Sequence, residues 1–157
     1  MSKIDSTQKR TNARLAAVQA LYQLEQSGTG VETVILEFQA HRLGGALEEH
    51  ILHEADDDLF ADLVRGVVRM QAKLDPFISR QLAKGWSLGR LDATVRAILR
   101  AGLYELVHRA DIPVKVTINE YVELAKAFFE DEEIGFVNGV LDAAANDVRA
   151  DDLQASP

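Results

Sequence analysis

The chain has no cysteine among its 157 residues, so disulfides, thiolate nucleophiles and thiolate metal ligands are all excluded. No apolar run approaches the roughly 20 residues that a membrane-spanning helix needs. The first ten residues, MSKIDSTQKR, lack the apolar block of a secretory signal peptide. We therefore expect a soluble, cytoplasmic protein that makes no use of thiol chemistry.

Catalytic motifs are also missing. We find no glycine-rich phosphate loop, no Gly-x-Ser-x-Gly and no His-Glu-x-x-His. His50 and His53 stand one helical turn apart beside glutamates, but two histidines without further organised ligands are typical of a solvated turn. The sequence therefore predicts a binding protein rather than an enzyme, with no cofactor and no metal site.

The net charge of −8 at pH 7 argues against a general nucleic-acid binder, because such proteins are basic overall. The charge is unevenly distributed, however. The first 14 residues contain four cationic side chains against the single acid Asp5, namely Lys3, Lys9, Arg10 and Arg14. A basic start on an acidic body indicates a localised anion-binding site, whose affinity depends on shape, stacking or a partner in addition to charge.

The stretch Lys9–Leu24 predicts a helix that is apolar on almost all sides, and such helices are buried. Its cationic start opposes the helix macrodipole, which favours anions at that end. From the residues alone, two interpretations stay open. The start is either a solvated basic tail or a phosphate site in which arginines and free backbone N–H groups converge on one anion.

Nearly every other segment also has helical periodicity, and no segment alternates as a strand does. Asp75 and Pro76 predict a new helix start, as N-cap and first helical residue. A capping box formed by Thr117 and Glu120 predicts another start. We count about seven helices with short connections, which predicts an all-α bundle.

The domain organisation follows from the same pattern. We expect residues 1–12 to be a flexible basic segment and residues 150–157 to be a loose tail. Between them, residues 13–149 form one helical domain whose two subdomains divide near residue 75. The helices are thereby shared between two small halves of one chain.

The longest amphipathic run is Leu91–Arg109, and its apolar face contains Gly102, which predicts a close helix–helix approach at that point. The other side of the run is rich in arginine. We interpret this side as a solvated face, with an RNA-binding stripe as the alternative. The arginines in question are Arg90, Arg96, Arg100 and Arg109.

Four blocks of sequence, taken in order, point to a known family. The first is AVQALY at 17–22, and the second is LYEL at 103–106. The third is INE at 118–120 with ELAK at 123–126, and the fourth is FVNGVLD at 136–142. Together they closely resemble the NusB family of bacterial transcription antitermination factors, over roughly residues 10–148.

The resemblance implies an all-α fold of two helical subdomains. It also implies binding of boxA-type single-stranded RNA together with the ribosomal protein known in this context as NusE. The implied setting is the antitermination complex of RNA polymerase, which reads through terminators, notably in ribosomal RNA operons. The positions that match the family's RNA-binding motifs are Lys9, Arg10, Arg14, Gln19, Tyr22, Phe136 and Asn138.

These residue types suit RNA, since arginine forks bind phosphates, aromatic rings stack on splayed bases and amides read base edges. The chain departs from the family at Arg10-Thr11-Asn12-Ala13-Arg14, where many members carry successive arginines. Fewer phosphate contacts predict weaker RNA binding alone, a shallower salt dependence and more reliance on the partner.

Two alternatives to this function stay open. One is a helical protein-interaction bundle with little RNA binding of its own. The other is the RNA-binding accessory module of a ribosomal RNA methyltransferase, which the absence of a methyl-donor domain before Pro157 disfavours. Self-association into a homodimer, which some family members show, is also left open.

Overall fold

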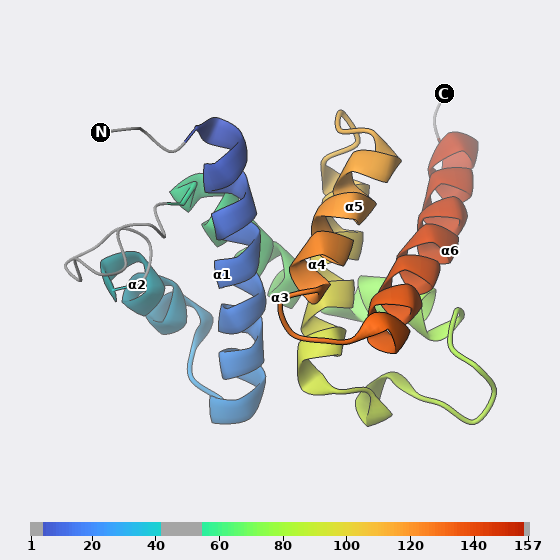
Figure 1. Ribbon diagram of the computed structural model, residues 1–157, viewed down its shortest axis with the longest axis horizontal. Coiled ribbons are helices and arrows are strands. Elements are labelled where there is room, and N and C mark those ends of the chain that lie inside the picture. Colours follow the sequence, from blue (N-terminus) through green and yellow to red (C-terminus); the bar gives the residue numbers. More distant parts are fainter. Residues whose placement is uncertain (1–4, 42–54, 156–157) are drawn as a thin grey trace. The chain divides into compact units, whose positions relative to one another are not determined.

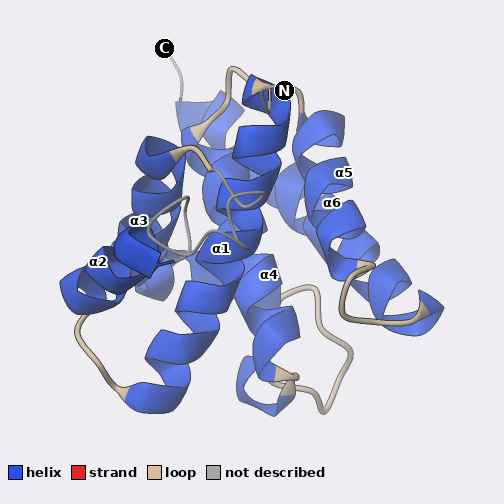
Figure 2. Cartoon of the chain, turned by 60° about the vertical axis from the view of Figure 1, so that its left-hand side comes forward, coloured by secondary structure: helices blue, strands red, loops and turns tan. Residues whose placement is uncertain are grey.

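The computed structural model describes residues 5–41 and 55–155, and every regular element within these ranges is helical (Figure 2). The prediction of an all-α fold is confirmed. The described residues contain six α-helices, where the sequence predicted about seven, and no strand. In chain order the elements are α1 (Ser6–Ser27), α2 (Val31–His41), α3 (Asp57–Ser79), the short 3₁₀ helix η2 (Leu88–Arg90), α4 (Ala93–His108), α5 (Val114–Ala125) and α6 (Asp131–Ala155).

The chain forms two compact units, Met1–Val68 and Arg69–Pro157, and we describe each by itself. The division falls inside α3, so this helix contributes its first half to unit 1 and its second half to unit 2 (Figure 1). The sequence placed the subdomain division near residue 75, which is also in α3.

Both ends of α1 are set by capping residues. Asp5 is the N-cap, and its carboxylate accepts a hydrogen bond from the backbone N–H of Gln8 at 2.8 Å. Gly28 is the C-cap in a left-handed conformation, with φ of 70°, and its N–H donates to the Leu24 carbonyl oxygen at 3.1 Å. The end of this helix is as predicted. Its start is not, because the segment expected to be flexible is helical from the residue after Asp5.

Helices α1 and α2 and the first half of α3 build the core of unit 1. Phe38 of α2 stacks on Phe60 of α3, with ring centroids 5.6 Å apart. On the surface, the Arg65 guanidinium donates two hydrogen bonds of 2.7 Å to the Glu32 carboxylate. These bonds lower the pKa of Glu32 and raise that of Arg65. The predicted burial of α1 is confirmed at Ala13, Ala16, Ala17, Val18, Ala20 and Leu21.

Helix α3 continues through Asp75 and Pro76, so the predicted helix start at this point is wrong. Asp75 does not cap a helix, because its carboxylate accepts two 3.0 Å hydrogen bonds from Arg100 of α4. A proline inside a helix costs about 3 kcal/mol or more. Leu74 and Ile78 are buried on either side of it and offset that cost. The uninterrupted α3 accounts for the lower helix count.

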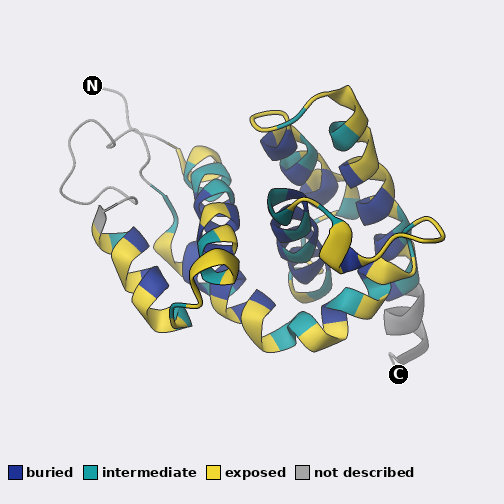
Figure 3. Cartoon of the chain, turned by 90° about the horizontal axis from the view of Figure 1, so that it is seen from below, coloured by how far each residue is buried: buried dark blue, intermediate teal, exposed yellow. Residues whose placement is uncertain are grey.

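Helix α4 is the central helix of unit 2 and packs against both α5 and α6; Figure 3 shows the burial of each residue. A Cβ atom added at Gly102 would lie 3.1 Å from both methyl carbons of Leu141 and 3.3 Å from the Cγ atom of Tyr121. The predicted close approach at Gly102 is therefore confirmed. One turn away, the Tyr121 hydroxyl donates to the fully buried Glu105 carboxylate at 2.8 Å.

Three helix boundaries in unit 2 differ from the predictions. Thr117 does not open a capping box, because α5 begins at Val114 after the N-cap Pro113 and Thr117 is buried within the helix. Helix α6 begins at Asp131, earlier than predicted, and its first turn carries three acids, which the helix dipole favours. It extends to Ala155, through most of the segment expected to be a loose tail.

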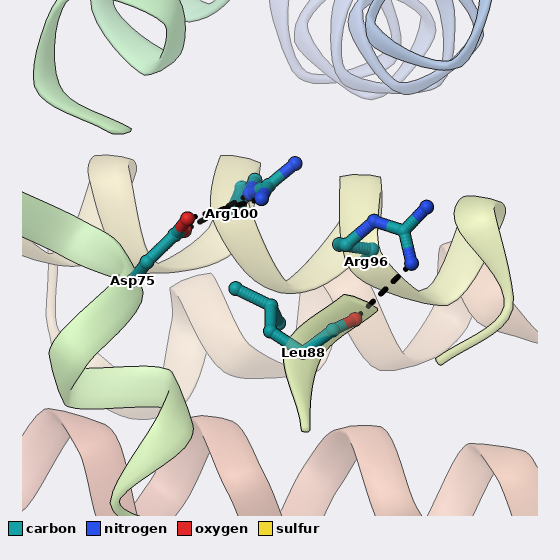
Figure 4. Close-up of polar contacts among 4 residues, drawn as sticks. All are labelled: Asp75, Leu88, Arg96 and Arg100. Atoms are coloured by element: carbon teal, nitrogen blue, oxygen red, sulfur yellow. Dashed lines mark hydrogen bonds and ion pairs between the residues drawn. The ribbon is translucent and has the colours of Figure 1, made fainter. Parts of the chain in front are cut away.

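Two arginines of α4 stabilise unit 2 from within (Figure 4). Arg96 donates through Nη1 to the carbonyl oxygens of Leu88 at 3.1 Å and Leu91 at 2.6 Å, which fixes η2 against the start of α4. Arg100 bonds Asp75, and its side chain is 13% exposed. The interpretation of this side of α4 as a solvated face is thus wrong for Arg96 and Arg100.

Candidate nucleic-acid interface

The basic start of α1 already holds an anion from the chain itself. The Asp5 carboxylate accepts the N–H of Gln8, and the Asp5 carbonyl oxygen accepts the N–H of Lys9 at 3.0 Å. One of the four orphan N–H groups at this end is therefore satisfied internally. A phosphate binding here would have to be held mainly by side chains rather than by the backbone.

The two arginines of this region have different surroundings. Arg10 and Arg14 lie one helical turn apart, on the side of α1 that also carries the buried residues Ala17 and Leu21. Arg10 keeps part of its surface in solvent, as does its neighbour Lys9, whereas Arg14 is only 4% exposed. Arg10 and Lys9 therefore present surface that a ligand can reach, and Arg14 can meet a ligand only if its side chain moves outward.

Gln19 and Tyr22 are both exposed, and their spacing of three residues places them on one face of α1. Tyr22 is 43% exposed, which argues against a role in the core. At about 100° per residue, Gln19 lies roughly 180° around the helix from Arg10. Gln19 therefore lies on the opposite side of α1 from Arg10, whereas Tyr22 lies about 60° from Gln19 and about 80° from Arg14.

In unit 2, Phe136 and Asn138 flank the exposed side of α6. Phe136 is 36% exposed and Asn138 is exposed, whereas Val137 between them is fully buried. At about 100° per residue, Gly135 and Gly139 fall on the arc between the two side chains. A Cβ atom at either glycine would meet nothing within 4 Å. The result is an open strip of backbone bordered by an aromatic ring and an amide.

This strip was not predicted from the sequence, although a signal was present. Glycine inside a helix costs about 1 kcal/mol relative to alanine, so two glycines one turn apart call for an explanation. Gly102 has one, in its contacts with Leu141, and Gly135 and Gly139 have none within the described chain. Close approach of a binding partner to the helix backbone is a reason that fits both positions.

The surroundings of this strip are acidic rather than basic. Asp131, Glu132 and Glu133 form the first turn of α6, directly before Gly135 and Phe136. Carboxylates repel phosphates, so this end of α6 suits contacts to bases more than contacts to the phosphate backbone. Among the motif residues predicted for the site, the basic ones that could hold phosphates belong to α1.

No group of three or more potential metal ligands comes together in the part of the chain that the structure describes. His50 and His53, considered above as ligands, lie outside the described residues. None of the described helices is long and apolar enough to cross a membrane.

The fold and these exposed side chains define an all-α binding protein with a basic helix start and aromatic and amide groups on two helices. The chain belongs to the NusB family, whose family model matches residues 11–146. It is 60% identical over 142 residues to the transcription antitermination protein NusB of Caulobacter vibrioides, covering 90% of this chain and 95% of that one. The corresponding protein of Sinorhizobium fredii is 57% identical, with 91% and 89% covered.

Solved structures agree with this assignment. NusB of T. maritima superposes with a TM-score of 0.73 at 32% identity, covering 93% of each chain. A second structure, of antitermination factors NusB and NusE in complex with double-stranded RNA, superposes with a TM-score of 0.68. It is 24% identical and covers 87% of this chain and 96% of that one, so this likeness concerns the fold alone.

Proposed function

We propose that this protein is a transcription antitermination factor that binds boxA-type single-stranded RNA together with the ribosomal protein NusE. In this role it promotes read-through by RNA polymerase, notably in ribosomal RNA operons. The observation that carries the proposal is the family membership over residues 11–146, with a relative of 60% identity that bears this function in its name. The function is binding rather than catalysis, and its place is the cytoplasm, where transcription occurs.

Within the helical domain of residues 13–149 and the basic segment before it, we assign the contacts unit by unit. In unit 1, Lys9 and Arg10 hold phosphates, because both keep surface in solvent at the basic start of α1. Tyr22 stacks on a base, and Gln19 reads a base edge from the side of α1 that is opposite Arg10. Arg14 joins the phosphate contacts only when its side chain leaves its buried position.

In unit 2, Phe136 provides a second stacking surface and Asn138 a second amide for base edges. Gly135 and Gly139 let a nucleotide approach the backbone of α6, because no Cβ atoms stand in its way. The acidic first turn of α6 keeps phosphates at a distance, so these contacts select bases.

Only two arginines in the basic start, one of them buried, support modest RNA affinity for the protein alone. Ribosomal proteins that bind RNA are basic, and the acidic body of this chain is electrostatically complementary to such a partner. We therefore propose that NusE supplies much of the binding free energy in the ternary complex.

The experiment is a salt titration of RNA binding with and without NusE. Fluorescence anisotropy of labelled boxA-type RNA is measured with the wild-type chain and with Arg10→Ala, Arg14→Ala and the control Lys73→Ala. Lys73 is exposed on α3, so the control removes the same charge away from α1. For Arg10→Ala we expect lower affinity and a log–log salt slope smaller by about 0.7, the value for one phosphate on a single strand.

The outcomes separate the competing functions. Unchanged RNA binding in both arginine variants would refute the assignment of the site to α1. If the protein binds NusE but shows no RNA preference, whether or not NusE is present, the protein-interaction bundle is favoured. Arg14→Ala is expected to weaken binding less than Arg10→Ala if Arg14 stays buried in the complex.

A further inference from the structure

The loop between α3 and α4 presents the most exposed aromatic side chain among the described residues. Trp86, the only tryptophan in the chain, is 54% exposed. From Pro76 to Leu91 the sequence contains three cationic residues and no acid, although the whole chain carries a net charge of −8. The three are Arg80, Lys84 and Arg90. An exposed indole in a basic segment of an acidic protein is not accounted for by the contacts described so far.

The fold holds Trp86 in this exposed position. Its backbone N–H donates to the Ala83 carbonyl oxygen at 3.0 Å, which closes a tight turn. Gly85 next to it has φ of 89°, a conformation that favours glycine. Arg90 donates through Nη1 to the Gly85 carbonyl oxygen at 2.9 Å. The indole is therefore displayed by an ordered turn.

The same turn brings a guanidinium group to the indole. The Cζ atom of Arg90 lies 5.1 Å from the centroid of the Trp86 ring, a cation–π distance. Farther along, Arg96 anchors the loop through the carbonyl oxygens of Leu88 and Leu91. The aromatic–cation pair thus stands on a support that α4 itself provides.

A cation–π contact at an exposed position stabilises a fold only weakly, so closing the loop does not by itself explain Trp86. Lys84 adds a cation that is exposed and takes no part in that contact. An aromatic face with neighbouring cations is the arrangement that binds single-stranded nucleic acid, because every base has a face that stacks and every linkage carries a charge.

We propose that the turn formed by Lys84, Trp86 and Arg90 is a further RNA contact, at which a base stacks on the indole and the two cations neutralise adjacent phosphates. The inference rests on the proposed RNA-binding function and extends it to a surface that none of the motif residues of α1 or α6 includes. Its ligand is single-stranded RNA of any sequence, since stacking and phosphate contacts do not read base edges.

The single tryptophan makes the test specific to this turn. The full-length protein is titrated with unlabelled oligoadenylate of roughly 12 nucleotides, a length within the usual site sizes for single strands. We expect saturable quenching of tryptophan fluorescence, weakened by added salt. In parallel, anisotropy of labelled boxA-type RNA reports binding through the proposed α1 site.

Substitutions then test whether each cation of the turn contributes to RNA binding. Lys84→Ala and Arg90→Gln are each expected to lower the oligoadenylate affinity measured by this quenching several-fold, whereas Lys115→Ala should leave the affinity unchanged. Lys115 is exposed in the first turn of α5, which follows the far end of α4. Its substitution by alanine therefore removes one positive charge at a position away from the loop. Trp86→Ala should weaken binding of labelled oligoadenylate roughly five- to ten-fold, the lower range for one stacked base, and Trp86→Phe should retain most of it.

Each outcome decides between the two proposals. Binding of boxA-type RNA without a change in tryptophan fluorescence overturns this inference and leaves the proposed function intact. Quenching by oligoadenylate with no preference for boxA-type RNA supports the turn and counts against the proposed function. Equal quenching by polyglutamate overturns the assignment to RNA, because the turn is then a site for acidic polypeptide.

Discussion

Arg100 and Asp75 form a bidentate ion pair that joins α4 to the second half of α3. The Nε and Nη2 atoms of Arg100 donate to the two carboxylate oxygens of Asp75, each at 3.0 Å (Figure 4). The side chains are 13% and 27% exposed, so the pair is shielded from much of the screening that weakens surface ion pairs. An arginine that resembled part of an RNA-binding stripe in the sequence thus has a structural role.

We expect Arg100→Gln or Asp75→Asn to lower the free energy of unfolding by about 1.5–3 kcal/mol, the range for hydrogen bonds that involve charged groups. Urea unfolding measures the change. Arg100→Lys should restore only part of the loss, because an ammonium group cannot reproduce the planar pair of bonds. In the double variant the losses should not add, and additive losses would show that the two residues do not stabilise each other.

The same ion pair shows why this part of the fold could not be predicted from the sequence. Asp75 followed by Pro76 is a sound start signal when only local chemistry is considered. The carboxylate is instead bonded to an arginine 25 residues away, and the helix continues. The sequence pattern does indicate the helix end at Gly28 and the close approach at Gly102, because these features depend on neighbouring residues or on one face of one helix. The cap at Asp5 also depends on neighbouring residues, but the pattern did not indicate it.

At the candidate site, too, only part of the arrangement could be predicted from the sequence. The residue types at Lys9, Arg10 and Tyr22 were visible in the sequence, and their chemistry is unambiguous. Burial was not, since Arg14 lies one helical turn from Arg10 in the same basic start and yet is only 4% exposed. Exposure depends on what packs over a side chain, and the periodicity of a helix does not reveal where that packing ends.

Two glycine-to-alanine substitutions in unit 2 should have opposite effects on stability. At Gly102 the new methyl group would lie 3.1 Å from Leu141, so overpacking is expected to cost about 1–3 kcal/mol. At Gly139 nothing lies within 4 Å, and the gain in helix propensity is expected to stabilise the chain by up to about 1 kcal/mol. Thermal and urea unfolding measure both changes.

Gly139→Ala also tests the open strip on α6. The variant should bind boxA-type RNA more weakly although it is more stable, because the added methyl group blocks close approach to the backbone. Higher stability with unchanged affinity would remove Gly139 from the proposed contact surface. Gly30→Ala is a suitable control, since this glycine of the α1–α2 connection also has open space around its Cβ position.

The ion pair between Glu32 and Arg65 predicts a pH dependence of stability in unit 1. Hydrogen bonds from Arg65 lower the pKa of Glu32 below its ordinary value of 4.5. The folded state therefore binds this proton less tightly than the unfolded state, and the stabilisation is present above pH 4.5 and is lost as the pH falls through the folded-state pKa. Both side chains are exposed, so the effect is small and should decrease with added salt.

Glu32→Gln removes this titration. The difference in unfolding free energy between wild type and variant should be largest at neutral pH and should vanish in acid below the folded-state pKa of Glu32. Urea unfolding at a series of pH values at low ionic strength measures it. A difference that stays constant down to low pH would mean that the carboxylate charge does not contribute, and that the substitution disturbs the packing of α2 on α3 in another way.

Tyr22 offers the sharpest test of base stacking on α1, because its ring is 43% exposed and contributes little to the core. Tyr22→Ala should lower affinity for boxA-type RNA by about 1–3 kcal/mol, the range for one base stacked on an aromatic ring, and leave the unfolding free energy nearly unchanged. Tyr22→Phe keeps the ring and should retain most of the affinity.

Phe128→Ala is the matched control, since Phe128 is 41% exposed in unit 2 and lies outside the matched RNA-binding motifs. If Tyr22→Phe loses as much affinity as Tyr22→Ala, the hydroxyl group rather than the ring makes the contact, and RNA binding at this face depends on a hydrogen bond instead of stacking.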